Sequence, residues 1–399
     1  MDDLKIELLD CSKEPDIADL DALVGTFNVQ HRTTYLRILS KHLDNKFKGY
    51  FVVATHHGET VAWTYMFMDE KFAFHGVLDG ALGKLYKVFP IKFNTAFISS
   101  PVAEYNVVHI NDKYKHQEGE ILDTVLAELL KILKKQRVSL ILMRDHIAPY
   151  SSKILDEEFN HLHFMPGSYV DFEGIHEHSD LCGSTCENGC TCFDDYLMRL
   201  KKKHRANIRN KMNRRKDDLK IDIVPASTLS AQQKARCHEL YVQTRDKQKL
   251  KHECLSPGYF HECASELGDC CKMMIASAGD NIIGFAQLLE NEDDIVNVRM
   301  GMDYKFNQEY NLYHHLLYEN IIYCLTLKKK RLYTSQTCYR PKLEVGAKLM
   351  PLHTYYRFTN PIWQKSLGRV LARSCKCYSE LTETDKPSEV LSKHGICPY

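Results

Sequence analysis

The feature that most constrains the fold is an order of secondary-structure elements that occurs twice along the chain. The first half contains two strand-type runs joined by a turn, then an amphipathic helix, a strand, a short helix and a strand, at residues 50–55, 60–68, 120–135, 138–143, 152–160 and 163–172. The second half contains two joined strands, a third strand, a helix and a further strand, at residues 272–277, 282–290, 295–303, 312–330 and 331–337. The repeated β-β-α-β-α-β order favours duplication of one unit, and a chance match of common α/β elements is the alternative.

A pair of proline-containing segments extends this correspondence. One begins at residue 163 and reads HFMPGSYVDF, and the other begins at residue 349 and reads LMPLHTYYRF, so each places an extended run after its proline. A chain of 399 residues also exceeds what one core usually organises. We therefore predict an N-terminal domain, a basic connecting helix, a C-terminal domain that holds the active site, and a tail that caps it, at residues 1–192, 193–219, 220–362 and 363–399.

The composition is that of an ordinary globular protein. Hydrophobic residues make up 44% of the chain, charged residues 26%, and the formal net charge is +1, which excludes a disordered chain or one that coats nucleic acid. The beginning of the sequence lacks a secretory pattern, and the apolar runs are far shorter than the roughly 18 residues that a membrane span needs. The 15 cysteines are then expected as reduced thiols. These features predict a cytoplasmic protein without a membrane span.

One segment departs from this charge balance. Residues 199–216 contain no acid and carry ten cations, namely Arg199, Lys201, Lys202, Lys203, Arg205, Arg209, Lys211, Arg214, Arg215 and Lys216. Such a run concentrates positive potential and predicts a phosphate-rich ligand, with Arg205, Arg209 and Lys211 as candidate contacts. A solvated helix without a ligand is the alternative.

Three segments together carry a family resemblance. They read FDDYLMRLKKKHRANIRNK from residue 193, GMDYKFNQEYNLYHHLLYENIIYCLTLKKKRLYTSQT from residue 301, and YRPKLEVGAKLMPLHTYYR from residue 339. In order and spacing they resemble the FemAB-like acyltransferases, in particular a bacterial peptidoglycan biosynthesis or recognition group with a BioF2-like acetyltransferase domain. The resemblance covers most of residues 40–362. It implies an α+β fold of tandem GNAT-like domains, each a mixed sheet flanked by helices, and amide formation from an activated acyl group.

The resemblance leaves the acyl donor open. Single-domain acetyltransferases hold the coenzyme A pyrophosphate on a glycine-rich turn before a helix, but residues 304–315 read YKFNQEYNLYHH and contain no glycine. The donor is therefore an acyl-CoA or similar thioester, or an aminoacyl-tRNA in a tRNA-dependent aminoacyltransferase. The acceptor is expected to be an amine of a small molecule, a peptide or a cell-wall precursor. A non-catalytic protein that recognises a phosphorylated glycan or RNA is a third possibility.

The candidate catalytic residues follow from the chemistry of amide formation. The reaction needs a neutral amine, a route for its proton and stabilisation of an oxyanion, and the sequence contains no nucleophile signature such as G-x-S-x-G. The resemblance marks Lys342 for charge stabilisation, with a surface lysine as the alternative. Tyr339 is a candidate proton donor, although a buried tyrosine with a structural role is the commoner case. His314 is a weak general-base candidate.

Polar residues on one predicted strand suggest an acceptor site. Period-two alternation over residues 295–303 places Asn297, Arg299 and Asp303 on one face of an otherwise apolar strand. That face is predicted either to line the acceptor site or to be a solvated face of the sheet.

A cysteine-rich loop suggests a metal. His176 and His178 precede Cys182, Cys186, Cys190 and Cys192 within one segment, and four such ligands could hold zinc tetrahedrally. The spacing matches no standard zinc finger, so free or redox-sensitive thiols are the alternative. The candidate ligands are the four cysteines.

Overall fold

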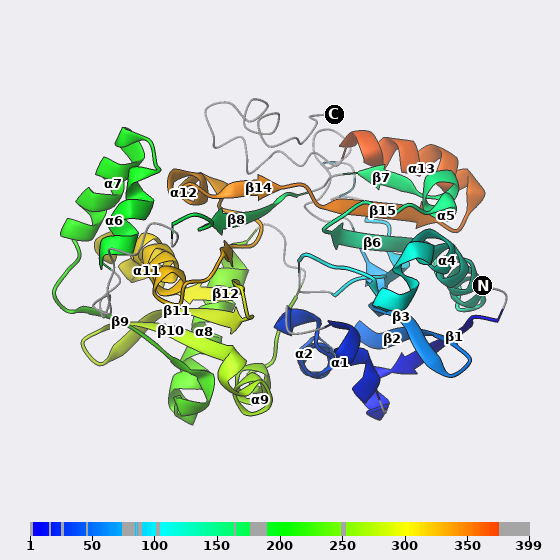
Figure 1. The fold of residues 1–399 in the computed structure, drawn as a ribbon, viewed down its shortest axis with the longest axis horizontal. Coiled ribbons are helices and arrows are strands. Elements are labelled where there is room, and N and C mark those ends of the chain that lie inside the picture. Colours follow the sequence, from blue (N-terminus) through cyan, green and yellow to red (C-terminus); the bar gives the residue numbers. More distant parts are fainter. Residues whose placement is uncertain are drawn as a thin grey trace.

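The structure is a computed structural model, and it describes most of the 399 residues. The described residues are 3–15, 17–24, 28–44, 47–73, 84, 86, 90–100, 104–162, 165–175, 190–248 and 253–374. Within them the chain forms two mixed β-sheets with helices on their faces (Figure 1), so the predicted α+β architecture is confirmed.

The first sheet is built mainly from the first half of the chain. Its strands in spatial order are β1 (Lys5–Asp10), β2 (Phe47–His56), β3 (Glu59–Phe72), β4 (Phe93–Phe97), β6 (Leu140–His146), β15 (His353–Phe358) and β7 (Asn160–Leu162), and β5 (His109–Ile110) pairs with β3. The hairpin predicted around residues 56–59 is present as β2 and β3. Nearly continuous apolar runs on these long strands bury both faces of the sheet.

The second sheet repeats the same plan. Its strands in spatial order are β9 (Leu219–Pro225), β10 (Cys271–Ala278), β11 (Asn281–Glu290), β12 (Asp294–Met302), β13 (Arg331–Tyr333), β8 (Gly167–Asp171) and β14 (Lys348–Met350). In each sheet the fourth and fifth strands are parallel and the other neighbours along this path are antiparallel. The two predicted units therefore share one topology.

Each sheet is completed by a strand from the other half. β8 comes from the first half of the sequence but pairs with β13 in the second sheet. β15 comes from the second half but pairs with β6 in the first sheet. These strands come from the two proline-containing segments that correspond in sequence. The exchange ties the halves together, and the division at residues 192 and 220 remains a prediction about domains.

The helices pack on the sheets around three hydrophobic cores. One core lies between the sheets and α1 (Ala18–Val24), α2 (Thr33–His42), α8 (Ala231–Lys247) and α9 (Gly258–Glu266). The outer face of the first sheet packs on α4 (Glu118–Lys135) and α5 (Lys153–Glu158). The outer face of the second sheet packs on α6 (Cys190–Met198), α7 (Lys202–Asn213), α10 (Tyr304–Tyr310) and α11 (Leu312–Thr326), and α12 (Tyr339–Glu344) follows β13. Because the central core draws on both halves, the halves pack as one body.

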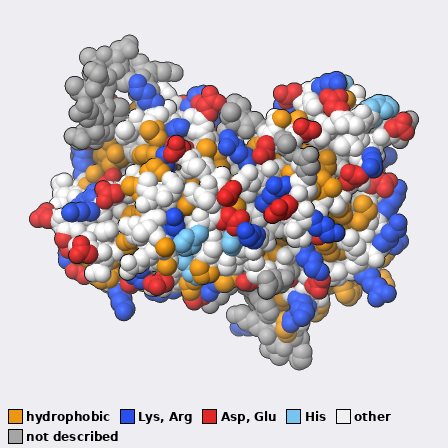
Figure 2. All heavy atoms as spheres, turned by 90° about the horizontal axis from the view of Figure 1, so that it is seen from below, with side chains coloured by type: hydrophobic (Ala, Val, Ile, Leu, Met, Phe, Trp, Pro, Cys, Tyr) orange, Lys and Arg blue, Asp and Glu red, His pale blue; other side chains and the backbone are white. Residues whose placement is uncertain are grey.

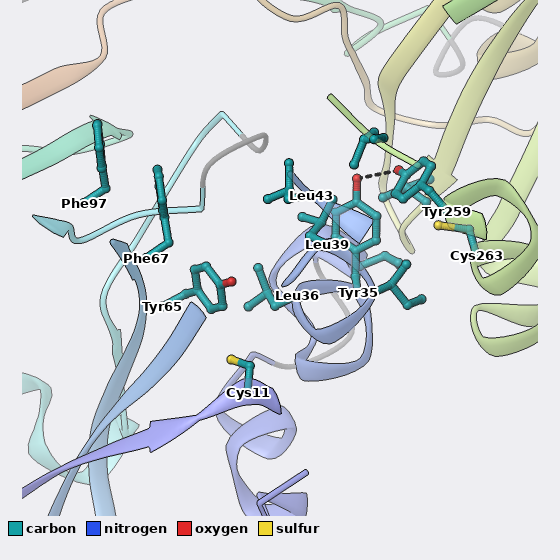
Figure 3. Packing of buried hydrophobic residues seen from close by; sticks show 14 of the residues in the cluster. Cys11, Tyr35, Leu36, Leu39, Leu43, Tyr65, Phe67, Phe97, Tyr259 and Cys263 are labelled. Atoms are coloured by element: carbon teal, nitrogen blue, oxygen red, sulfur yellow. Dashed lines mark hydrogen bonds between the residues drawn. The ribbon is translucent and has the colours of Figure 1, made fainter. Parts of the chain in front are cut away.

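The central core can be followed around α2. Leu36 and Leu39 of this helix are buried and point toward the first sheet, while Tyr35 reaches Tyr259 of α9 across the junction (Figure 3). Burying a leucine of this kind stabilises the fold by about 1.5–3 kcal/mol. The helix thus joins the two halves by packing on both.

Two elements differ from the predictions. The basic segment forms two helices, α6 and α7, rather than one, and the break lies at 199–201. The part of the tail that the structure describes is α13 (Pro361–Ser374), which packs on β15 and β7 of the first sheet, whereas residues 375–399 lie outside the described residues and their predicted capping of the second half remains a prediction. The Tyr356 hydroxyl donates to the Gly368 carbonyl at 2.6 Å. α13 lies beside the first sheet because β15, which precedes it in sequence, pairs in that sheet.

Among the described residues, no helix combines the length and the apolar character that a bilayer crossing requires. On the face shown in Figure 2, acidic and basic side chains are intermixed, in keeping with the net charge of +1.

Candidate functional site

Unusual backbone conformations gather where the two parallel strand pairs end. In the first half Tyr105 and Asp145 have φ values of 64° and 58°, and in the second half Ser335, Thr337 and Cys338 have values of 64°, 64° and 48°. Left-handed backbone is unfavourable for residues with a side chain, especially a β-branched one such as Thr337. Such strain persists only where surrounding contacts impose it, and it is typical of functional sites.

Lys342 holds the strained loop that follows β13. β12 and β13 pair only over Asp294–Val296 and Arg331–Tyr333, and the chain then turns through residues 334–338 into α12. The Lys342 ammonium donates to the carbonyls of Ser335 and Gln336, both at 2.9 Å. With 4% of its surface exposed, Lys342 is not the surface lysine of the alternative interpretation.

An acidic side chain of the first half meets this loop. The Gln336 backbone N–H donates to Oε1 of Glu104 at 2.9 Å, and Oε2 of Glu104 is buried without a hydrogen bond in the described part of the chain. Burial raises the pKa of Glu104 to about 7, against the opposing effects of the Gln336 N–H and the Lys342 charge. This pKa lies where a proton acceptor at neutral pH is most effective.

A second charged pair lies within the second half of the chain. Arg299 of β12 and Glu253 are 3.3 Å apart, and only 8% and 23% of their side chains are exposed. Burial raises the pKa of Glu253, and the charges of Arg299 and Arg144 oppose this. The charge of Arg144, at the end of β6, also opposes the rise in the pKa of Glu104. Nε of Arg144 lies 3.1 Å from Oδ2 of Asp145.

These side chains form what we call the junction cluster. Its members are Glu104, Arg144, Asp145, Glu253, Arg299 and Lys342, contributed by both halves of the chain. The sequence marks Lys342 and Arg299, but it gives no signal for the other four. They belong to no motif, and the fold alone brings Glu104, Glu253 and the adjacent Arg144 and Asp145 together.

A β-bulge changes which residues of β12 share a face of the sheet. Gln287 pairs with Arg299 while its neighbour Leu288 pairs with Asn297, so one residue of β12 is extra at this point. Paired residues share a face and consecutive ones alternate, so Asn297 and Arg299 lie on opposite faces. The prediction that Asn297, Arg299 and Asp303 share one face is therefore wrong for Asn297.

Asp303 is held by other contacts. Its carboxylate accepts from the Lys305 backbone N–H at 3.1 Å, which caps α10, and lies 3.3 Å from Arg236 of α8. A carboxylate at this position complements the positive end of the helix.

Tyr339 and His314 lie on either side of the strained loop in sequence. Tyr339 is buried, and its hydroxyl donates to the Pro166 carbonyl at 2.8 Å. Burial and the charge of Lys211 lower the pKa of His314 to about 4. A histidine with this pKa is neutral at pH 7 but accepts a proton weakly. Their catalytic roles remain predictions.

The basic run is partly neutralised. Arg209 pairs with Asp194 at 2.9 Å, Arg215 pairs with Glu319 at 2.6 Å, and Lys216 pairs with Glu309. Within the described ranges Lys201, Lys202, Lys203, Arg205 and Arg214 have no acidic partner, and all but Arg205 are exposed.

The α7 helix lies beside α12 (Figure 1). Asn207 donates to Glu344 at 3.3 Å, and Glu344 opposes the burial that lowers the pKa of Lys211. The unpaired cations of α7 are thus on a helix that touches the helix of Lys342.

The predicted zinc ligands cannot be placed. Cys182 and Cys186 lie outside the described residues, as do His176 and His178, and the side chains of Cys190 and Cys192 are likewise not described. Among the residues that are described, no cluster of three or more His, Cys, Asp or Glu could hold a metal ion. Zinc binding by the cysteines remains a prediction.

Buried histidines predict a loss of stability in mild acid. Burial lowers the pKa of His109, His146, His314 and His315 to about 4. The unfolded chain then binds more protons between pH 6.5 and 4, so the free energy of unfolding falls as the pH falls through this window. The raised pKa values of Glu104, Asp145, Glu253 and Asp294 act in the opposite sense, so the contribution of the histidines is isolated by substitution.

The measurement is the urea midpoint at pH 7, 6 and 5. Each extra proton bound by the unfolded chain contributes up to about 1.4 kcal/mol per pH unit. His146, whose ring nitrogens lie 2.9 Å from the Tyr150 hydroxyl and 3.0 Å from the Ile98 carbonyl, is the informative position. His146→Gln should flatten the dependence, and a stability that is constant down to pH 5 would contradict this interpretation.

Two solved structures with TM-scores above 0.5 share this fold at low sequence identity. FemX is 9% identical at a TM-score of 0.53, and the match covers 91% of this chain and 99% of FemX. L-PGS from Bacillus licheniformis is 10% identical at a TM-score of 0.51, covering 91% of this chain and 98% of L-PGS. A tandem GNAT protein from the clavulanic acid biosynthesis pathway is 9% identical at a TM-score of 0.49, covering 90% and 99%. A search of curated proteins found no match.

A family model matches more than half of the sequence. The FemAB-like model, described as peptidoglycan biosynthesis/recognition, matches residues 169–385 of the 399. This stretch includes the basic helix α7, the strands from β9 to β15, and Lys342 with its strained loop. Because this match covers more than half of the chain, the chain belongs to the FemAB-like family.

Proposed function

We propose that this protein transfers an acyl or aminoacyl group from an activated donor to an amine, and that the reaction takes place at the junction cluster. The observation that carries the proposal is the placement of Lys342. Within a chain of the FemAB-like family, its ammonium is buried, fixed on a strained loop and faces a carboxyl of the other half. A fixed cation of this kind can stabilise negative charge that develops during attack on a carbonyl.

The cluster offers a group for each step of amide formation. An amine attacks only in its neutral form, so its proton must be accepted. Glu104, with a pKa of about 7, is the proposed acceptor. Lys342 is the proposed partner of the oxyanion, and collapse of the tetrahedral intermediate expels the donor's hydroxyl or thiol as the amide forms.

The end of β12 favours an aminoacyl ester over an acyl-CoA as donor. Coenzyme A would place its pyrophosphate at the helix that follows this strand. Here the Asp303 carboxylate already occupies the N-terminus of α10 and is itself anchored by Arg236. A pyrophosphate would meet a like charge at that point, so we propose an aminoacyl-tRNA, with the exposed cations of α7 contacting its phosphates.

The experiment compares the two donors directly. The purified chain is incubated either with ¹⁴C-aminoacyl-tRNA or with ¹⁴C-acetyl-CoA, and with an extract that supplies amine-bearing small molecules, peptides and cell-wall precursors. We expect label to leave the aminoacyl-tRNA and not the thioester, in an extract-dependent manner. Transfer from acetyl-CoA alone would overturn the donor assignment, and release from neither would favour a recognition protein.

The tRNA proposal predicts a salt-dependent affinity that depends on α7. Lys202→Glu together with Lys203→Glu should weaken binding of labelled tRNA, because the charges of two exposed cations are reversed. The slope of log affinity against log salt concentration should fall by about 2. Lys131→Glu on α4, where the lysine is 67% exposed, is the control. Equal slopes for all three proteins would exclude α7 as the contact.

A further inference from the structure

A hydrogen-bonded chain of serine, histidine and glutamate lies away from the junction cluster, where α2 meets α9. His42 is the last residue of α2, Ser256 lies just before α9, and Glu262 is on α9. The Ser256 Oγ is 2.7 Å from Nδ1 of His42, and Nε2 of His42 is 2.5 Å from Oε2 of Glu262. The two helices pack against each other beside the Tyr35 and Tyr259 pair (Figure 3).

The charge of Glu262 fixes the direction of these hydrogen bonds. Burial raises the pKa of Glu262, but hydrogen bonds from Lys41 and His42 outweigh burial and hold it below its usual value. An ionised carboxylate can only accept, so a neutral His42 ring carries its hydrogen on Nε2. Nδ1 then has a lone pair, and the Ser256 hydroxyl donates to it. This is the arrangement in which an imidazole can take the proton of an attacking hydroxyl.

The surrounding contacts hold the histidine and leave the serine accessible. The Ser256 backbone N–H donates to the His42 carbonyl at 2.9 Å, so the two residues are also joined through the main chain. A Cβ at Gly258 would lie 2.5 Å from Cε1 of His42, which means that only glycine lets the ring lie at the start of α9. Ser256 itself is exposed, whereas only 11% of the His42 side chain is exposed.

We propose that Ser256, His42 and Glu262 form a second reactive site, in which Ser256 is a nucleophile toward activated carboxylic esters. Ser256 Oγ attacks the ester carbonyl while His42 Nδ1 takes its proton. The carbonyl–oxygen bond to the alcohol then breaks, and the alcohol leaves with the proton from His42. Water attacks the resulting acyl-serine with His42 as base, which releases the carboxylic acid and restores the hydroxyl.

The start of α9 adds to this chemistry. The helix contains nine residues and begins at Gly258, two positions after the serine. The N–H groups of a first helical turn lack acceptors within the helix, and that end carries partial positive charge. Negative charge that develops on an ester oxygen beside Ser256 is therefore favoured there. The feature depends on neither Lys342 nor the proposed donor.

The test uses a fluorophosphonate probe and p-nitrophenyl acetate on the full chain. We expect one fluorophosphonate per chain, located on Ser256 by peptide mass spectrometry, and release of p-nitrophenol that Ser256→Ala abolishes. His42→Gln should slow both reactions by about 100-fold or more, as expected when a general base is lost. Ser265→Ala is the matched control, because the hydroxyl of this exposed serine in α9 lies 3.1 Å from the Glu262 carbonyl oxygen and 3.0 Å from a Glu266 carboxylate oxygen rather than beside a histidine.

Two outcomes would overturn the proposal. One is an unmodified Ser256 in the wild-type protein after exhaustive labelling. The other is labelling of Ser256 at an unchanged rate in His42→Gln, since the histidine would then be only a structural link between α2 and α9. Neither probe contains an amine or an aminoacyl donor, so these results are separate from the test of acyl transfer.

Discussion

Lys342→Met is expected to lower kcat for acyl transfer by about 100- to 1000-fold, the effect seen when one fixed oxyanion donor is lost. Methionine retains most of the volume of the lysine but supplies no charge. The carbonyls of Ser335 and Gln336 lose their common donor, so the strained loop should also become less stable. The Ser335 carbonyl keeps the Ser168 hydroxyl as a donor, so the cost of about 1–3 kcal/mol for an unpaired group falls on the Gln336 carbonyl. The measurement is steady-state transfer kinetics together with the urea midpoint.

The matched control is Lys348→Met. Lys348 lies on β14 and pairs with Asp171 at 2.6 Å, but 52% of its side chain is exposed. An exposed pair contributes about 0–1 kcal/mol, so both activity and stability should stay close to wild type. If Lys342→Met keeps the wild-type kcat while its loop remains folded, Lys342 has a structural role alone. A rise in KM without a change in kcat would instead mean that Lys342 binds the ground state.

Arg299→Met is expected to destabilise the protein by about 3–5 kcal/mol, because it removes the ion-pair partner of the largely buried Glu253. The sequence marks Arg299 as a substrate contact, whereas the structure places it against Glu253 with Tyr35 and Tyr259 nearby. The urea midpoint should therefore fall sharply even without any substrate. A double-mutant cycle with Glu253→Gln isolates the pair.

The cycle distinguishes a structural from a binding role. If the pair is structural, the double variant should be more stable than the sum of the two single effects predicts, because neither buried charge is left alone. If Arg299 binds substrate instead, Arg299→Met should unfold at the wild-type midpoint and raise KM. That second result would support the predicted role of Arg299 in the acceptor site.

The duplicated order was predictable because each strand and helix carries its own local signal. The hairpin at residues 56–59 and the amphipathic helix α4 follow from alternation and helical spacing. The strand exchange was not predictable. The segments that become β8 and β15 have the same character, so either could pair in either sheet, and only the packing of the whole chain decides. The position of α13 follows from the pairing of β15 in the first sheet.

The site was predictable only where a motif carried it. The resemblance marks Lys342, but Glu104 and Arg144 stand alone in sequence and become neighbours through tertiary structure. The bulge in β12 is invisible in a pattern of alternating residues, and it turns Asn297 to the other face. Likewise, His42 and Ser256 are separated by more than half of the chain's length and no local signature joins them.

The most direct test of the proposed acyl transfer is the chemical nature of the product. The chain is incubated with ¹⁴C-aminoacyl-tRNA and the amine-containing extract, and the labelled product is treated with hydroxylamine, which cleaves esters and thioesters but leaves amides intact. We predict a hydroxylamine-resistant product whose formation is lost, by about 100-fold or more, in Lys342→Met. A product that hydroxylamine cleaves, or an amide that forms equally well with Lys342→Met, would contradict amide formation at the junction cluster.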